Sequence, residues 1–145
     1  MKVQPYFNFD GKAQEAFEFY QNIFGGVLFK MSMGEAPGSE NMTEEEKARM
    51  MHISLRISDD LLLMASDIVP SMGHELRIGN QTYISIFPDS RKEADRIFEK
   101  LSRGAAIEMP LADQFWGDYY GSLKDRYGIK WMVNYEGAPA NAHPL

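Results

Sequence analysis

The chain of 145 residues contains no cysteine. A disulfide framework is therefore excluded, and with it the commonest sign of a small exported domain. The N-terminus also lacks the basic segment and following apolar run of a secretory signal. We therefore expect the protein to be cytoplasmic.

Long hydrophobic runs and an excess of positive charge are also missing. No stretch approaches the roughly 18 apolar residues that a membrane-spanning helix requires. The 15 lysines and arginines are outnumbered by 21 aspartates and glutamates, giving a net charge of −6. The basic residues are scattered, whereas a nucleic-acid surface gathers them in a stripe. We expect neither a membrane nor a nucleic acid as partner, and the acidic balance weakly favours a small neutral or cationic ligand.

The first half of the sequence alternates strand-like and helix-like segments. A strand is expected at residues 3–9, and apolar residues then recur at helical spacing from Ala13 to Phe24. We expect Asp10 to cap this helix and Gly25-Gly26 to end it. A strand at 27–33 follows, then a loop at 34–50 in which Thr43 and Glu46 have capping-box spacing. Segments 52–58 and 61–67 are typical of a hairpin that turns at Asp59-Asp60.

The second half repeats this order. We expect a strand at 82–88, a helix that starts after Ser90 and ends near Gly104, a strand at 105–111, and a hairpin formed by 119–125 and 129–135. Similar residues of the two halves align at an offset of about 78 residues before the longer loop of the first half, and at about 68 residues after it. The sequence thus predicts an α+β protein with two βαβββ modules, at about 1–70 and 80–137, in a single domain of residues 1–137 with a tail at 138–145.

Two long segments support a family assignment. They are "PYFNFDGKAQEAFEFYQNIFGG" near the start and "FWGDYYGSLKDRYGIKWMVN" near the end. Over about residues 3–135 the chain resembles the PhnB-like family of the vicinal oxygen chelate superfamily, also called glyoxalase/bleomycin-resistance/dioxygenase proteins. The resemblance implies a glyoxalase-like fold, in which curved mixed sheets enclose a central cup, and a homodimer. Many relatives are labelled ubiquinone-pathway methyltransferases, but this sequence has no glycine-rich strand-to-helix loop to support a nucleotide-like cofactor.

The resemblance also implies where a metal would bind. In metal-using members, the ligands come from positions that correspond here to Pro5, Met64, Tyr83 and Met132. Proline has no side-chain donor, thioethers are soft ligands, and a neutral phenol binds divalent ions poorly. Only three histidines occur, His52, His74 and His143. We therefore expect no metal and no cofactor.

Strand alternation predicts which residues face the cup. Trp131 and Val133 are expected to face the helices, in the core. Asn134 and Lys124 are expected to face the cup. Trp116 is placed at the rim. The predicted ligand-binding set is Phe7, His52, Ser54, Arg56, Met64, Tyr83, Ser85, Trp116, Tyr120, Ser122 and Met132.

Several of these residues also have a purely structural interpretation. His52 is either a structural or exposed histidine or a group that exchanges protons near neutral pH. Arg56 and Lys124 suit solvated strand positions, and the two methionines suit packing or an adaptable apolar pocket. The aromatic side chains of Trp116 and Tyr120 also suit a dimer contact.

Three functions follow from these alternatives. The first is a metal-free protein that binds a small molecule in the cup between the modules. The second is an enzyme of lyase or isomerase type that uses His52 as base and Tyr83 as acid, or a weakly held metal. The third is a dimeric interaction module without a ligand.

Overall fold

The computed structural model describes residues 1–137, which form two compact units, Met1–Arg77 and a second that begins at Ile78. Each unit is considered by itself. The predicted tail at 138–145, with His143, lies outside the described residues.

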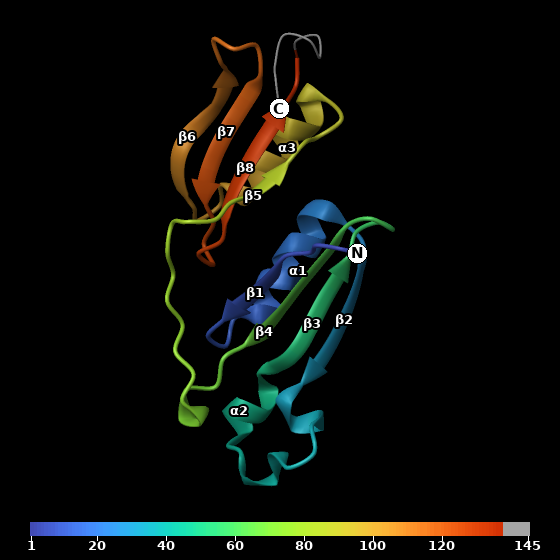
Figure 1. Cartoon of the computed structure of the whole chain (residues 1–145), viewed down its shortest axis with the longest axis vertical. Helices are drawn as coiled ribbons and strands as arrows, with labels where there is room; N and C mark the ends of the chain where they lie inside the picture. Colours follow the sequence, from blue (N-terminus) through green and yellow to red (C-terminus); the bar gives the residue numbers. More distant parts are fainter. Residues whose placement is uncertain (138–145) are drawn as a thin grey trace. The chain divides into compact units, whose positions relative to one another are not determined.

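The first unit is a four-stranded sheet with one long helix (Figure 1). Its sheet has the order β1-β4-β3-β2, in which β1 is parallel to β4 and the other neighbours are antiparallel. The elements in chain order are β1 (Tyr6–Phe9), α1 (Ala13–Phe24), β2 (Val27–Ser32), the 3-10 turns η1 (Met33–Glu35) and η2 (Ser39–Asn41), α2 (Glu44–Ala48), β3 (Met50–Arg56), β4 (Leu62–Asp67) and η3 (Pro70–Met72).

The core of this unit lies between the sheet and α1. Phe9 and Phe17 are almost fully buried, and their rings meet edge to face at 6.4 Å. Ile53 and Leu55 are fully buried on the same side of the sheet, as strand alternation predicted. Each such side chain contributes about 1.5–3 kcal/mol when it leaves water.

The start of α1 is held by a residue distant in sequence. The two carboxylate oxygens of Asp67, at the end of β4, accept hydrogen bonds from the backbone N–H of Ala13 at 3.0 Å and of Met50 at 2.8 Å. Asp10, the predicted cap, instead accepts from the Arg49 guanidinium at 2.7 Å. The prediction for Asp10 is therefore wrong, because a buried carboxylate from the neighbouring strand takes that place. The predicted capping box of Thr43 and Glu46 is present.

The second unit repeats the first. Its sheet has the order β5-β8-β7-β6, with β5 parallel to β8, and α3 covers one face (Figure 1). Its elements are β5 (Ile84–Ile86), α3 (Arg91–Leu101), β6 (Ala106–Asp113), β7 (Tyr119–Lys124) and β8 (Lys130–Tyr135). The predicted α+β class with two βαβββ modules is confirmed.

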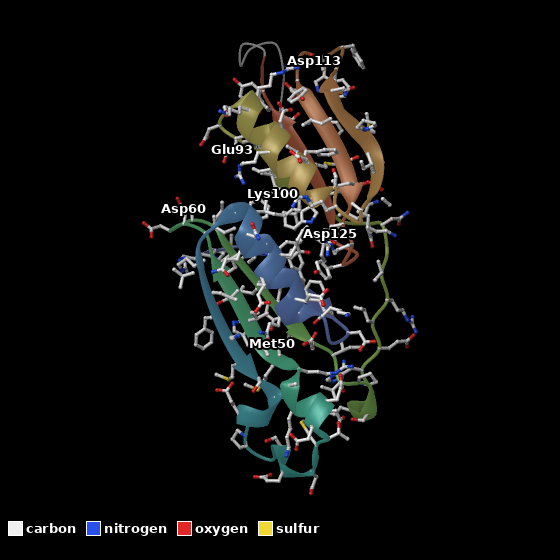
Figure 2. The ribbon with its side chains drawn as sticks, turned by 180° about the vertical axis from the view of Figure 1, so that it is seen from behind. Met50, Asp60, Glu93, Lys100, Asp113 and Asp125 are labelled. Carbon is white, nitrogen blue, oxygen red and sulfur yellow. The ribbon has the colours of Figure 1, made fainter. Side chains whose placement is uncertain are left out.

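Trp131 organises the core of the second unit. Its side chain is 1% exposed, and its indole N–H donates to Asp125 at 2.8 Å. The other oxygen of Asp125 accepts from the backbone N–H of Tyr127 and of Ile129, which shapes the turn between β7 and β8, where Asp125 is labelled (Figure 2). The predicted core positions of Trp131 and Val133 are confirmed.

In the described part of the chain, no helix combines the length and the apolar character needed to cross a membrane.

Candidate functional site

Each sheet has one face against its own helix and a second face, here called its open face, on the other side. In the first unit His52, Ser54 and Arg56 alternate with the buried Ile53 and Leu55 and so lie on the open face. In the second unit Tyr120, Ser122 and Lys124 alternate with Leu123, which pairs with Trp131 and is fully buried. All six therefore lie on the side of their sheet that faces away from its helix, and their part in a ligand-binding cup stays a prediction.

Phe7 is a correction to the predicted set. Its side chain is 8% exposed, and its ring meets Phe17 of α1 at 6.3 Å, so it lies on the helix side. The prediction took its register from Pro5, which in the structure precedes β1. Tyr6, directly opposite Met64, occupies the open face instead. The apolar core requires both phenylalanines of β1, and this requirement sets the alternation.

The open face of the first sheet carries an aromatic group centred on His52. The Tyr6 hydroxyl lies 3.3 Å from His52 Nδ1, and the Phe29 ring lies 6.5 Å from the imidazole. Met64 stands opposite Ser54 on the neighbouring strand. Arg56 donates to the backbone carbonyls of its own hairpin turn, at Ser58 and Asp59. It therefore braces the turn.

Tyr83 immediately precedes β5 and belongs to an ion-pair cluster on the second unit. Its hydroxyl donates to Glu108 Oε1 at 2.9 Å, and Lys130 Nζ lies 2.8 Å from Glu108 Oε2. The ammonium also lies 4.3 Å from the centre of the Tyr83 ring, within the range of a cation–π contact. Glu108 falls where the pairing of β6 with β7 shifts register between Ile107 and Met109. Such an irregularity re-aims a side chain.

The charges of this cluster stabilise one another. The hydrogen bond from Lys130 holds the pKa of Glu108 below its ordinary value, and Tyr83 and the more distant Lys124 act in the same direction. The Glu108 carboxylate in turn raises the pKa of Lys130. Glu108 and Lys130 therefore remain charged at neutral pH.

A groove lies on the open face of the second unit, at the end away from the cluster of Tyr83, Glu108 and Lys130. Its volume is about 280 Å³, and a larger cavity of about 390 Å³ shares Phe87 and Asn134 with it. The rings of Trp116 and Tyr120 meet at 6.1 Å and an angle of 60°. Asn134 donates its amide N–H to Asp118 at 3.1 Å. The residues that line the groove are Ser85, Phe87, Trp116, Asp118, Tyr120 and Asn134.

The structure brings some of the predicted ligand-binding residues together and places others apart. Ser85, Trp116 and Tyr120 share the groove, and Met132 stands between Ser85 and Ser122 in the same sheet. His52 and Tyr83 belong to different units and have different partners.

Sequence reasoning missed Glu108, Lys130 and Asp118. Alternation along β8 could have identified Lys130, because it shares a face with Met132. No sequence signal marks the register shift that aims Glu108, or the turn that buries Asp118.

The positions that correspond to metal ligands do not fit a divalent ion. Pro5 has no donor, Met64 and Met132 offer only thioethers, and the Tyr83 hydroxyl donates a hydrogen bond to the Glu108 carboxylate. Within residues 1–137, no three histidines or acidic residues gather in a way that could hold a metal. We derive no chemistry through a metal at these positions.

Comparison with known proteins agrees with this fold and these motifs. The family model described as 3-demethylubiquinone-9 3-methyltransferase matches residues 1–134. The chain belongs to this family. It is the PhnB-like family. A glyoxalase/bleomycin resistance protein/dioxygenase family enzyme from Burkholderia phytofirmans shares the fold at 16% identity, with a TM-score of 0.57 over 90% of this chain and 96% of that one.

Two relatives of this PhnB-like chain match it along nearly the whole length. Protein YjdN of Escherichia coli K12 is 30% identical, over 92% of this chain and 95% of its own. The crystal structure of PA1353 from Pseudomonas aeruginosa is 35% identical, with a TM-score of 0.82 over 94% of this chain and 98% of that one. A Bacillus cereus PhnB protein, titled a putative 3-demethylubiquinone-9 3-methyltransferase, shares the fold at 22% identity, with a TM-score of 0.67 over 93% and 99% of the two chains.

The methyltransferase description of the family would require a methyl-donor cofactor. Nucleotide-like cofactors favour a glycine-rich connection from a strand to a helix. Here the connection after β1 contains the single glycine Gly11, and the connection after β5, residues 87–90, contains none. These connections do not fit such a cofactor, and we derive no methyl-transfer step.

Proposed function

We propose that this PhnB-like protein is a metal-free small-molecule binding protein whose ligand lies on the open face of the second sheet. The observation that carries the proposal is the groove of about 280 Å³ beside the Trp116 and Tyr120 rings. Small-molecule sites combine aromatic walls with a few polar groups that fix orientation. Ser85 and Asn134 supply such groups in the groove.

The chemistry of the neighbouring cluster favours binding over catalysis. An acid–base pair must lie within hydrogen-bond reach of one substrate position, but the Tyr83 hydroxyl donates its hydrogen bond to Glu108 and His52 lies beside Tyr6. A lysine base must be neutral, but the pKa of Lys130 is raised. For these reasons we rank the lyase or isomerase alternative, with His52 and Tyr83 as its catalytic pair, below a binding function.

The test is native mass spectrometry of protein purified without added metal, together with elemental analysis of the same sample. We expect no stoichiometric metal and a reproducible organic mass on the protein. Stoichiometric metal would contradict the metal-free proposal and favour the enzyme alternative.

Variants then locate the bound mass. Tyr120→Ala removes one wall of the groove and should abolish the organic mass. Met72→Ala is the control, because Met72 is a 59% exposed apolar residue of the first unit and does not line the groove. Retention of the mass in Tyr120→Ala, or its absence from the wild-type protein, would contradict the proposed site.

A further inference from the structure

The open face of the second sheet changes character along its strands. Residues that pair across β5, β8 and β7 share a row, and successive rows on one face are two residues apart, or about 7 Å. The first row contains Asn134 and Tyr120 and adjoins the groove. The second contains Ser85, Met132 and Ser122, and the third contains Lys130 and Lys124.

The first and third rows lie toward opposite ends of the sheet. Figure 2 labels Asp113, which pairs with Tyr119 next to the groove, and Asp125, which follows Lys124 directly. The two labels stand at the two ends of the second unit (Figure 2). The first row, beside the aromatic groove, and the lysine row are therefore about 14 Å apart along the strands, for a rise of about 3.4 Å per residue.

The third row concentrates positive charge. Lys124 and Lys130 are direct cross-strand partners, and like charges in this arrangement repel each other. Glu108 is the carboxylate that the cluster supplies. It pairs directly with Lys130, whereas the charge of Lys124 lowers the pKa of Glu108 from farther away. Asp125 is turned to the other side of the sheet, where it accepts from the Trp131 indole. Two lysines of this row thus have the single carboxylate of Glu108 beside them, while Asp118 lies at the groove, next to Asn134.

We propose that the lysine row binds a carboxylate of the ligand whose aromatic part occupies the groove. This inference rests on the proposed function and names the class of ligand: an aromatic or aryl-alkyl carboxylate that extends over Ser122 and Met132. A carboxylate supplies the second negative charge that the two lysines lack, and Lys124, which is exposed, is free to turn toward it. The ligand is thus an anion, although the net charge of −6 weakly favours neutral or cationic molecules.

Three probes of equal length test the charge preference. They are phenylhexanoate, its neutral amide phenylhexanamide and the cationic phenylhexylamine, each titrated against the full-length protein by calorimetry at pH 7.5. We expect the carboxylate to bind most tightly and the amine most weakly. Added salt should weaken the carboxylate and leave the amide nearly unchanged, because screening acts on the charge pair.

Lys124→Gln assigns the preference to the lysine row. It should weaken phenylhexanoate by about fivefold, the upper range for a partly exposed ion pair, and leave phenylhexanamide unchanged. Lys92→Gln is the control, because Lys92 is an exposed lysine on α3, the helix that covers the other face. Native circular dichroism of both variants checks that the fold is intact.

The outcomes separate this inference from the proposed function. Equal affinity for acid and amide, or no effect of Lys124→Gln, would overturn the carboxylate assignment while the groove remained a binding site. Failure of all three probes to bind would overturn the aryl-alkyl carboxylate class, whereas the proposed function is decided by the organic mass found by native mass spectrometry; Tyr120→Ala shows whether any binding observed belongs to the groove.

Discussion

Asp67 is a single residue on which two elements depend. Its carboxylate caps α1 through Ala13 and also accepts from Met50 at the start of β3, and the side chain is 4% exposed. Asp67→Ala would leave two backbone N–H groups without these partners. We expect a loss of about 2–4 kcal/mol in the free energy of unfolding, measured by urea denaturation.

Asp10→Ala is the matched comparison for this prediction. Asp10 is the aspartate that the sequence favours as the cap, but it forms a more exposed ion pair with Arg49. Its replacement should cost less than about 1 kcal/mol. An equal loss in the two variants would contradict the assignment of the cap to Asp67.

Glu108 and Lys130 predict a definite pH dependence. The pKa of Glu108 is lowered in the folded protein, so its stabilising contribution is present above the ordinary value of 4.5 and disappears as the pH falls through the lowered pKa. The pKa of Lys130 is raised, so its contribution is present below the ordinary value of 10.5 and disappears as the pH rises through the raised pKa.

Thermal unfolding across pH tests the pair. Glu108→Gln should lower the Tm by a few degrees at pH 7 and have a smaller effect near pH 3, because the contribution of the carboxylate declines once the pH falls below its ordinary pKa of 4.5. Glu99→Gln is the control, because Glu99 forms a longer exposed pair with Arg103 at 3.9 Å. A difference between wild type and Glu108→Gln that stays constant from pH 3 to pH 7 would exclude an ionic contribution.

At the scale of elements, the packing of α3 against its sheet depends on the absence of a side chain at Gly121. A Cβ at this position would lie 2.8 Å from the Phe98 ring and 2.8 Å from the Leu111 Cα. Gly121→Ala should therefore destabilise the protein by about 1–3 kcal/mol through overpacking. Gly79→Ala is a suitable control, because a Cβ there meets nothing within 4 Å. Equal unfolding free energies for the two variants would contradict this close approach.

The elements also show what the sequence can predict. Apolar periodicity located both long helices and the hairpins, because each is determined by residues close together in the chain. The cap of α1 could not be found in this way, since Asp67 lies 54 residues from Ala13. The side of Phe7 was missed for a similar reason: its place in the core depends on Phe17 of α1, not on the repeat with the second half.

The same distinction between local and long-range determinants applies to the candidate site. Alternation placed Ser85, Tyr120 and Ser122 on the open face, and Trp116 and Tyr120 meet in the groove. Glu108 could not be placed, because the shift in pairing between β6 and β7 depends on the contact of two strands. The irregular pairing of the edge strand β6 makes the side of Glu108 unpredictable from the sequence, and in the structure Glu108 lies next to Lys130.

At the scale of the whole molecule, we propose a homodimer. The first sheet gives a physical reason, because Val27 and Phe29 on its β2 edge are 72% and 53% exposed. Exposed apolar side chains gathered on one strand are typical of an interaction surface. Light scattering after size-exclusion chromatography should therefore give twice the chain mass of 16.6 kDa.

Phe29→Asp should shift the protein toward the monomer, because a carboxylate buried in an apolar interface loses its hydration. Phe115→Asp introduces the same charge at a 98% exposed aromatic residue outside the strands and should leave the dimer intact. A wild-type protein of single-chain mass at micromolar concentration would contradict the dimer, and a dimer unaffected by Phe29→Asp would exclude the β2 edge as its interface. Comparing the two aspartate variants separates an effect of this surface from a general effect of added negative charge on a chain that already carries −6.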